Sequence, residues 1–397
     1  MKKLLLFGAG KIGRSFVGQL FCRSGYELIF VDVDQKIVNL LNKETSYKVV
    51  TVDSNNPEKE GEYIVDKVTA LHSSEKEIII KTIVEADLIA LSVGKRGLLG
   101  LGELLAKGIS QRYLVKESTP IDIILAENVR DAASLLRREI QKHIVDVSVE
   151  DYVGLVETSI GKMVPIMTKE QLDKDPLAVY AEPYNTLIVD EFGFKSTIPK
   201  VDGLAPKKNM KAWVDRKIFI HNLGHAVLSY QANYYYPELI YTWEALAVQS
   251  LRAITRETML QSMNILMALY PDEFTGQELV SHIDDLLVRF SNKALGDTIY
   301  RVGSDLSRKL NKDDRLMTPI LIAVELNMKF SLIIDAWVKG CFFSAFDNEG
   351  NITPLDKDFI EKYARNPILV LSDHCKFDCE KYKMLYEEVR KIMEGMR

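Results

Sequence analysis

The fold of this chain is decided by one stretch near its N-terminus, Leu4-Leu5-Leu6-Phe7-Gly8-Ala9-Gly10-Lys11-Ile12-Gly13-Arg14. The apolar run over residues 2–7 predicts a buried strand, and the apolar spacing over residues 12–21 predicts a helix. Between them lies Gly-x-Gly-x-x-Gly, in which Gly8 allows the tight turn and Gly10 lets the backbone approach a pyrophosphate. Gly13 lets the helix pack closely against the strand. The stretch therefore predicts a phosphate-binding turn at a helix N-terminus.

An acidic residue at the end of the next strand indicates which nucleotide this turn binds. Residues 27–33 predict that strand, and Asp32 stands near its end, about 20 residues beyond the glycines. A carboxylate at this place accepts hydrogen bonds from the adenosine ribose and repels the 2′-phosphate of NADP. No arginine follows directly, so the sequence predicts NAD as the cofactor. The alternative role for Asp32 is to cap the helix predicted at residues 35–41.

The predicted cofactor site also includes the end of a later strand, residues 87–93, where the chain is expected to pass beneath the bound nucleotide. The cofactor-binding residues predicted from these patterns are Phe7, Gly8, Ala9, Gly10, Lys11, Ile12, Gly13, Arg14, Asp32, Val93 and Gly94.

Strands that are apolar throughout alternate with helical patterns over the first half of the chain. Further strands of this kind are predicted at residues 121–126 and 153–157, with a helix at 129–144 between them. Such alternation is typical of a parallel sheet covered on both faces. We therefore expect an α/β fold with a Rossmann-type, doubly wound parallel sheet at the N-terminus. A β-rich insert is expected at residues 47–53 and 63–71, around a polar loop.

The pattern changes near residue 200. Residues 197–211 are rich in Pro, Gly and Lys and predict a linker. After it the periodicity is helical almost throughout, so an all-helical C-terminal domain is expected. The predicted domains are residues 1–200 and 201–397, and the predicted helices of the second are residues 213–232, 239–269, 276–290, 319–345 and 356–364.

Composition excludes several classes of function. Apolar residues make up 47% and charged residues 27% of the 397 residues, and the formal net charge is −5 without a basic cluster, so no nucleic-acid partner is expected. No apolar run approaches the ~20 residues of a membrane span, and the first run ends at Gly8, too early for a signal peptide. The four cysteines lack paired spacings and predict reduced thiols in a cytoplasmic protein without a metal site. We expect a small-molecule substrate and a monomer or small homo-oligomer.

Polar residues in an otherwise apolar helix mark the candidate chemical site. On a regular helix Lys217, His225 and Asn222 fall at about 0°, 80° and 140°, on one side that could line a common cleft. Burial would lower the pKa of the lysine, and a neutral amine can take the hydroxyl proton of an alcohol as hydride leaves. Asn222 could donate to the developing alkoxide, and His225 could orient a neighbouring hydroxyl. The spacing alone leaves open a solvated lysine and histidines that merely fill the core.

The stretch Arg216-Lys217-Ile218-Phe219-Ile220-His221-Asn222-Leu223-Gly224-His225 resembles the K-x4-N-x2-H motif of the polyol-specific long-chain dehydrogenases, the mannitol dehydrogenase family. The resemblance begins at residues 7–14 and continues through residues 126–128, 182–183 and 188–190. It ends with residues 289–292 and 301–315, so it covers most of the chain to about residue 330.

This resemblance implies roles for individual residues. It implies Lys217 as general base, Asn128 and Asn222 as holders of the oxyanion, and His225 as a substrate ligand. It also implies reversible, metal-independent hydride transfer between NAD and a sugar-alcohol phosphate, with mannitol 1-phosphate and fructose 6-phosphate as the pair. For the phosphate, the resemblance favours Arg308 and Lys309, although a solvated helix face would explain these cations equally well.

One departure leaves the sugar open. Relatives carry an Asp-Arg pair where this chain has Gly161-Lys162, ahead of Met163-Val164-Pro165. The alternative function is therefore an NAD-dependent dehydrogenase of an unphosphorylated polyol or sugar acid, such as mannitol, arabinitol or altronate. A more remote alternative is a regulatory protein that binds NAD without turnover.

Overall fold

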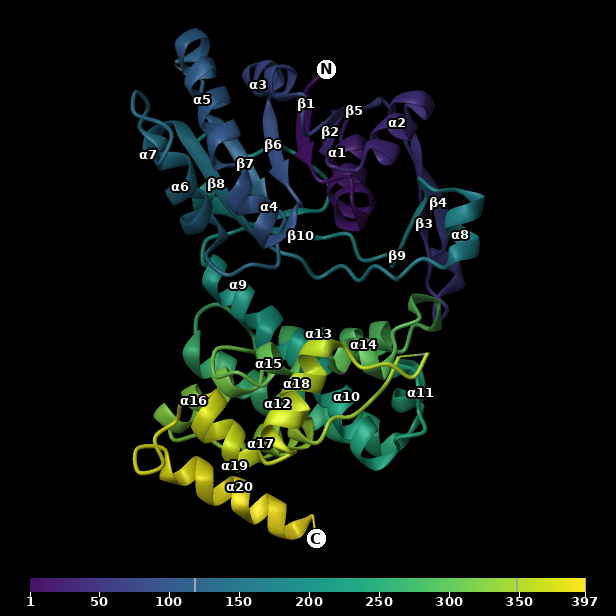
Figure 1. Cartoon of the computed structure of the whole chain (residues 1–397), viewed down its shortest axis with the longest axis vertical. Helices are drawn as coiled ribbons and strands as arrows, with labels where there is room; N and C mark the ends of the chain where they lie inside the picture. Colours follow the sequence, from purple (N-terminus) through teal and green to yellow (C-terminus); the bar gives the residue numbers. More distant parts are fainter. Residues whose placement is uncertain (118, 348, 397) are drawn as a thin grey trace. The chain divides into compact units, whose positions relative to one another are not determined.

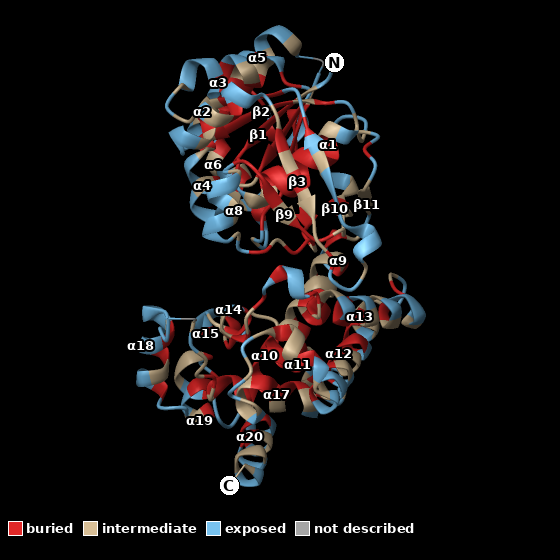
Figure 2. Ribbon diagram, turned by 90° about the vertical axis from the view of Figure 1, so that its right-hand side faces the viewer, coloured by how far each residue is buried: buried red, intermediate tan, exposed pale blue. Residues whose placement is uncertain are grey.

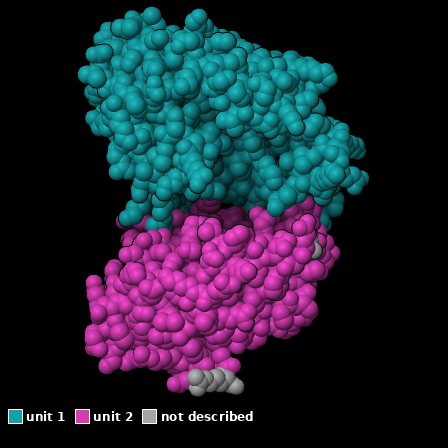
Figure 3. All heavy atoms as spheres, viewed as in Figure 1, with its two compact units in different colours: residues 1–214 teal, residues 215–397 magenta. Residues whose placement is uncertain are grey.

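The computed structural model of the chain describes residues 1–117, 119–347 and 349–396. It divides into two compact units, Met1–Val214 and Asp215–Arg397 (Figure 3). The boundary between the two units follows Val214 and therefore lies C-terminal to the linker predicted at residues 197–211. Figure 1 shows the order of the elements along the chain.

Unit 1 is built around eight strands in the order β11-β10-β8-β7-β6-β1-β2-β5 within its described residues. The strands β5, β2, β1, β6, β7 and β8 pair in parallel, whereas β10 runs antiparallel to β8. Their bounds are β1 Lys3–Phe7, β2 Glu27–Asp32, β5 Val68–His72, β6 Leu88–Leu91, β7 Ile121–Leu125, β8 Val153–Ser159, β10 Leu187–Asp190 and β11 Leu204–Lys207.

Both faces of this sheet are covered, as β1 shows residue by residue. Leu4 and Leu6 belong to one buried apolar cluster, while Leu5 and Phe7 belong to another on the opposite face. Side chains alternate between the faces of a strand, so an apolar run needs a cover on each side. Figure 2 shows the strands in red beneath helices with pale outer faces. The predicted doubly wound Rossmann-type sheet is confirmed.

The helical elements of unit 1 connect these strands. They are η1 Gly13–Gly18, α1 Gln19–Arg23, α2 Gln35–Glu44, η2 Pro57–Lys59, α3 Lys76–Glu85, α4 Gly94–Gly100, α5 Gly102–Lys116, α6 Ala132–Gln141, α7 Val149–Tyr152, α8 Lys169–Lys174, η3 Glu191–Gly193 and the start of α9 Met210–Arg216. The helices α3, α4 and α5 were not predicted from the apolar pattern.

The expected β-rich insert is only partly correct. The strands β3 Tyr47–Thr51 and β4 Gly61–Val65 form a second sheet with β9 Val179–Ala181. The segment predicted as one strand over residues 63–71 instead breaks at Lys67, which has a left-handed φ of 56°. Its second half, β5, joins the large sheet beside β2. The expected linker at residues 197–211 is also partly wrong, because it contains the edge strand β11.

Unit 2 is helical in its described part, as expected from the sequence. Its elements are the end of α9, η4 Lys217–Asn222, α10 Leu223–Tyr235, α11 Thr242–Ala247, α12 Gln249–Leu269, α13 Gly276–Phe290, η5 Lys293–Leu295, α14 Ile299–Gly303, α15 Leu306–Lys309, α16 Met317–Glu325, α17 Ser331–Cys341, α18 Pro354–Tyr363, α19 Pro367–Leu369, η6 Val370–His374 and α20 Lys383–Gly395. Helix α10 lies at the centre and contacts α12, α14 and α17. In the part of the chain that is described, no helix is both long and apolar enough to cross a membrane.

Two of the long helices predicted for unit 2 are each divided in the structure. Residues 239–269 form α11 and α12, separated at Val248. Residues 319–345 form α16 and α17, and the break between them contains Asn327 at a φ of 53°. A left-handed residue ends a helix in the same way as a glycine does, and asparagine tolerates it better than most residues.

Candidate active site

The turn after β1 has the geometry that a dinucleotide requires. Gly8 has a φ of 97°, and a Cβ built on it would lie 2.1 Å from the carbonyl oxygen of Ser92. A Cβ on Gly13 would lie 2.1 Å from the carbonyl oxygen of Gly8. Nothing lies within 4 Å of the Cβ position of Gly10, so the backbone is open there. These positions match the three tasks of the glycines in a dinucleotide-binding turn.

Asp32 lies against this turn at the end of β2. Its Oδ2 accepts the N–H of Ala9 at 2.6 Å, and its Oδ1 accepts the N–H of Asp34 at 2.9 Å. The residue that caps α2 is Asp34, whose Oδ1 accepts the N–H of Lys36 at 2.9 Å. The alternative interpretation of Asp32 as a helix cap is therefore wrong. The carboxylate of Asp32 lies at the carboxyl end of β2, where the ribose of a dinucleotide binds.

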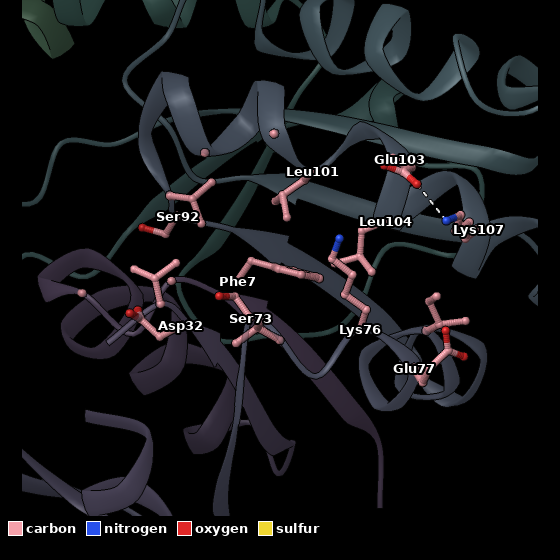
Figure 4. A pocket seen from close by; sticks show the side chains of 18 residues that line it. Phe7, Asp32, Ser73, Lys76, Glu77, Ser92, Leu101, Glu103, Leu104 and Lys107 are labelled. Atoms are coloured by element: carbon pink, nitrogen blue, oxygen red, sulfur yellow. Dashed lines mark hydrogen bonds and ion pairs between the residues drawn. The ribbon is translucent and has the colours of Figure 1, made fainter. Parts of the chain in front are cut away.

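A cavity of about 610 Å³ opens beside Asp32 and the glycine turn. Of the predicted cofactor residues, Phe7, Gly8, Gly10, Asp32 and Val93 line it (Figure 4). Further parts of the wall come from α3, α4, α5 and the residue between α4 and α5, none of which was predicted from the sequence to bind the cofactor: Lys76, Glu77, Ile80, Gly97, Gly100, Leu101, Glu103, Leu104 and Lys107. The apolar walls suit an adenine ring and the carboxylate suits a ribose, so the cavity fits the adenosine half of NAD.

Two basic residues of the glycine turn are engaged with the protein's own backbone. The Nζ of Lys11 donates to the carbonyl oxygen of Pro165 at 3.1 Å. Arg14 is buried, and its Nε donates to the carbonyl oxygen of Ala9 at 2.8 Å while its Nη1 donates to that of Leu177. Burial lowers the pKa of the Arg14 guanidinium. Arg14 thus supports the turn from within the fold.

The carboxylate of Glu127, for which no role was predicted from the sequence, holds the residues that follow β6. The Oε1 of Glu127 accepts the N–H of Val93 at 2.6 Å, and both of its oxygens accept the N–H of Gly94 at 3.0 Å. Glu127 is buried, and burial raises its pKa. Asn128, the residue after it, is exposed at the carboxyl end of β7. Glu127 therefore fixes the loop that is predicted to run beneath the cofactor, and it also precedes the candidate oxyanion ligand Asn128.

The predicted chemical site in unit 2 lies on a helix of mixed geometry. Residues 210–235 run continuously through α9, η4 and α10, and η4 is a π-helix from Lys217 to Asn222. The regular spacing assumed for Lys217, Asn222 and His225 therefore does not apply. A π-turn bonds residue i to residue i+5 and brings these two closer to one face than an α-helix does. Such turns occur frequently at functional sites.

The environment of Lys217 changes its acidity. Burial and, to a smaller extent, the nearby positive charge of Arg315 together lower the pKa of its ammonium group from 10.5 to about 8. The Nη1 of Arg315 donates to the carbonyl oxygen of Asn222 at 3.4 Å, which places the guanidinium beside the motif. A lysine with a pKa near 8 can serve as a base close to neutral pH.

The two histidines of the motif are packed against Phe290. The rings of His225 and Phe290 stack at 3.7 Å between centroids, and those of His221 and His225 lie 5.0 Å apart. Burial holds the pKa of both imidazoles well below 6.5. The Nε2 of His225 is buried and has no hydrogen-bond partner among the described residues. A neutral imidazole with an unsatisfied nitrogen fits the predicted role of His225 as a ligand for a substrate hydroxyl.

Four cations lie close enough to His225 to lower its pKa further, namely Arg301, Arg315, Lys309 and Arg289.

The two residues predicted for the phosphate, Arg308 and Lys309, have different surroundings in the structure. Lys309 is buried, and its Nζ donates to the carbonyl oxygen of Val302 at 2.6 Å. Burial lowers the pKa of Lys309 to about 7. The half-exposed Arg308 is instead paired with Asp305 at 2.5 Å and Asp314 at 3.2 Å.

The position that departs from the family pattern lies in unit 1. The Nζ of Lys162 donates to Oδ1 of Asn185 at 3.1 Å and stands 5.5 Å from the centre of the Phe16 ring.

Within the ranges that the structure describes, no group of three or more His, Cys, Asp or Glu side chains could hold a metal ion. The four cysteines are free thiols.

Comparison with known proteins gives consistent matches for both units. Residues 2–203 match the Mannitol dehydrogenase Rossmann domain, and residues 209–369 match the Mannitol dehydrogenase C-terminal domain. The mannitol-1-phosphate 5-dehydrogenase of Geobacillus stearothermophilus is 32% identical over 79% of this chain and 80% of its own length. That of Streptococcus mutans is 31% identical over 81% of this chain and 82% of its own length.

Two solved structures share the fold at low sequence identity. A D-sorbitol dehydrogenase in substrate-free form has a TM-score of 0.79 at 15% identity, covering 98% of this chain and 93% of its own. The mannitol 2-dehydrogenase of Pseudomonas fluorescens, in a ternary complex with NAD and D-mannitol, has a TM-score of 0.73 at 13% identity. It covers 100% of this chain and 92% of its own.

Proposed function

The chain belongs to the mannitol dehydrogenase family, and we propose that it interconverts D-mannitol 1-phosphate and D-fructose 6-phosphate with NAD. As a member of this family it is an NAD-dependent polyol dehydrogenase. The observation that carries the finer proposal is the match of both units to relatives named mannitol-1-phosphate 5-dehydrogenase. The cations around His225 support it, because a sugar phosphate needs positive charge at its binding site.

The proposed chemistry uses the amine of Lys217 as general base and needs no metal. When bound, NAD⁺ supplies the acceptor for the hydride that leaves the carbinol carbon. The neutral amine of Lys217 takes the proton of the same carbinol, so the C–H and O–H bonds are replaced by a carbonyl. The lysine then returns its proton to solvent. A pKa near 8 keeps roughly one amine in ten neutral at pH 7, which an ordinary lysine would not.

The remaining residues of the motif are proposed to hold the substrate. The amide groups of Asn222 and Asn128 would donate to the developing alkoxide. His225 would use its unsatisfied Nε2 on a neighbouring hydroxyl. For the phosphate we propose Lys309 and Arg315 ahead of Arg308. Arg308 is paired with two aspartates, whereas Arg315 is paired with Asp314 alone and its Nη1 donates to the carbonyl oxygen of Asn222 in the motif.

A substrate panel tests the proposal. Rates of NADH or NADPH formation are measured with mannitol 1-phosphate, mannitol, arabinitol and altronate, each with NAD and with NADP. We expect kcat/KM to be highest for mannitol 1-phosphate with NAD. Preference for a free polyol or for altronate would refute the proposal of a phosphorylated substrate. Gly161-Lys162, in place of the Asp-Arg pair of relatives, is the departure in the sequence that makes this test necessary. Absence of turnover with all four would favour a protein that binds NAD without catalysis.

A further inference from the structure

The segment that carries the proposed phosphate ligand Lys309 cannot hold its own conformation. It begins at Asp305, whose φ of 75° is left-handed, and continues as α15, a helix of only four residues. A helix this short has a costly nucleus and few internal hydrogen bonds to repay it. The segment from Asp305 to Leu310 must therefore be fixed by other parts of the protein.

One such contact comes from α18, about 50 residues later in the chain. The Oδ2 of Asp356 accepts the N–H of Asp305 at 2.9 Å, and its Oδ1 accepts the N–H of Leu306 at 2.7 Å. Asp356 is 2% exposed. Its own N–H is accepted by Oγ1 of Thr353, the residue that caps α18, at 3.2 Å. A single buried carboxylate thus satisfies two backbone donors at the start of α15, and charge makes such bonds stronger than neutral ones.

The carbonyl groups of the same segment are bonded from η6 and the residue that follows it. The Nε2 of His374 lies 2.6 Å from the carbonyl oxygen of Ser307, and since a carbonyl only accepts, the ring donates. The Sγ of Cys375 donates to the carbonyl oxygen of Leu310 at 3.3 Å. Burial raises the pKa of Cys375 to about 12, so it remains a thiol and keeps its proton for this bond.

Aromatic packing connects the donors of η6 with α18. The ring of His374 lies 5.2 Å from that of Phe359 and 5.7 Å from that of Tyr363, both on α18. The hydroxyl of Tyr363 donates to Oδ2 of Asp373 at 3.1 Å. We define the residues from Thr353 to Cys375 as the C-terminal brace. Its contacts bond the backbone of Asp305–Leu310 at both of its ends.

We propose that the C-terminal brace positions Lys309 for the substrate phosphate, with Asp356 as the main positioning residue. The proposal rests on the proposed function, in which Lys309 binds that phosphate. Lys309 lies between the two ends that the brace holds, and its charge acts on His225 of the motif helix. The backbone bonds to Asp356 and His374 restrict where its amine can stand. The brace would therefore contribute to substrate selection without contacting substrate.

Asp356→Asn is the variant that tests this role. An amide keeps one acceptor but turns an N–H₂ group towards a backbone N–H, so one of the two bonds is lost and the other loses its charge. Asp358→Asn is the matched control, because Asp358 is exposed on the same helix. For both variants kcat and KM are measured with mannitol 1-phosphate. Mannitol is measured beside it, as a substrate or as a competitive inhibitor, and the Kd for NAD is determined.

We expect Asp356→Asn to raise the KM for mannitol 1-phosphate about tenfold, the effect of losing one charge-assisted hydrogen bond. The constant for mannitol and the Kd for NAD should change less than about twofold, and Asp358→Asn should resemble the parent protein. An equal loss for mannitol and its phosphate would overturn the proposal, because it would indicate a purely structural effect. An unchanged KM for the phosphate would overturn it as well.

A second variant and a second measurement keep the result decisive if Asp356→Asn folds poorly. His374 is only partly buried, so His374→Ala removes its bond to Ser307 at less risk to the core. The same selective rise in KM is expected, with a smaller size. Amide hydrogen exchange of residues 305–310 should be faster in both variants whichever polyol the parent protein prefers. Faster exchange in a protein without preference for the phosphate would therefore refute the proposed function alone, and unchanged exchange would refute the brace.

Discussion

The acidity of Lys217 gives a prediction that pH alone can test. Its pKa is lowered from 10.5 to about 8, first by burial and then by Arg315. At pH 7 this leaves roughly one amine in ten neutral, against about one in three thousand for an ordinary lysine. The site geometry therefore makes the base roughly 300-fold more available at neutral pH.

The sign of the pH dependence follows from the role of the amine. Only neutral Lys217 can take a proton, so kcat/KM for polyol oxidation should fall about tenfold for each pH unit below 8. Above pH 8 the base is fully available, and any decline there reflects the loss of positive charge on Lys309, whose pKa is about 7. The substrate phosphate has its second pKa near 6 and is fully charged over the upper part of this range, so the limb between pH 7 and 9 belongs to the enzyme.

The assay is the initial rate of NADH formation at subsaturating mannitol 1-phosphate and saturating NAD, from pH 6.5 to 10.5. Buffers are overlapped to separate pH from buffer effects. A rate that keeps rising up to pH 10 would show that Lys217 has an ordinary pKa. A flat profile would show that proton removal by this group does not limit kcat/KM. Either result would exclude Lys217 as a base with a pKa near 8.

Three further predictions concern unit 1. Asp32→Ala should lower the preference for NAD over NADP at least about tenfold, whereas Asp34→Ala should cost about 1 kcal/mol of stability through the lost cap of α2 and leave the preference unchanged; equal effects on preference would contradict the assignment of Asp32. Glu127→Gln should raise the Kd for NAD about tenfold, measured by quenching of protein fluorescence, because it weakens the bonds to the loop at Val93 and Gly94; an unchanged Kd and kcat would remove Glu127 from the site. Gly10→Ala should fold normally and bind NAD poorly, whereas Gly13→Ala should lower the melting temperature, since a Cβ meets nothing within 4 Å at Gly10 but lies 2.1 Å from the carbonyl oxygen of Gly8 at Gly13.

The sequence allowed the dinucleotide turn to be predicted because its signal is local. The strand, the glycines and Asp32 lie within thirty residues, and the apolar pattern of β1 fixes both faces of the sheet. The break at Lys67 was missed because no glycine or proline marks it, and the pairing of β5 with β2 depends on distant residues. The edge strand β11 was mistaken for a linker, since its Pro206 is tolerated only at an edge.

The candidate site was predicted in its residue types and less well in its geometry. The motif identified Lys217, Asn222 and His225, but apolar periodicity does not distinguish a π-turn from a regular turn. Glu127 had no sequence signal of its own, because its partners are backbone N–H groups more than thirty residues earlier. Arg308 and Lys309 differ in their surroundings, because Lys309 is buried and Arg308 is exposed and ion-paired. Two adjacent basic residues look equivalent in the sequence, which does not show which of them is buried.

In the mechanism that we propose, the amine of Lys217 is the base for hydride transfer to NAD. The most direct measurement is turnover of mannitol 1-phosphate by Lys217→Ala, with Lys211→Ala as control because Lys211 is exposed on the same continuous helix. We expect kcat for Lys217→Ala to fall by about 10³-fold or more while the Kd for NAD stays within about twofold, and the control to keep its activity. Retention of more than about a tenth of the parent kcat by Lys217→Ala would exclude Lys217 as the base.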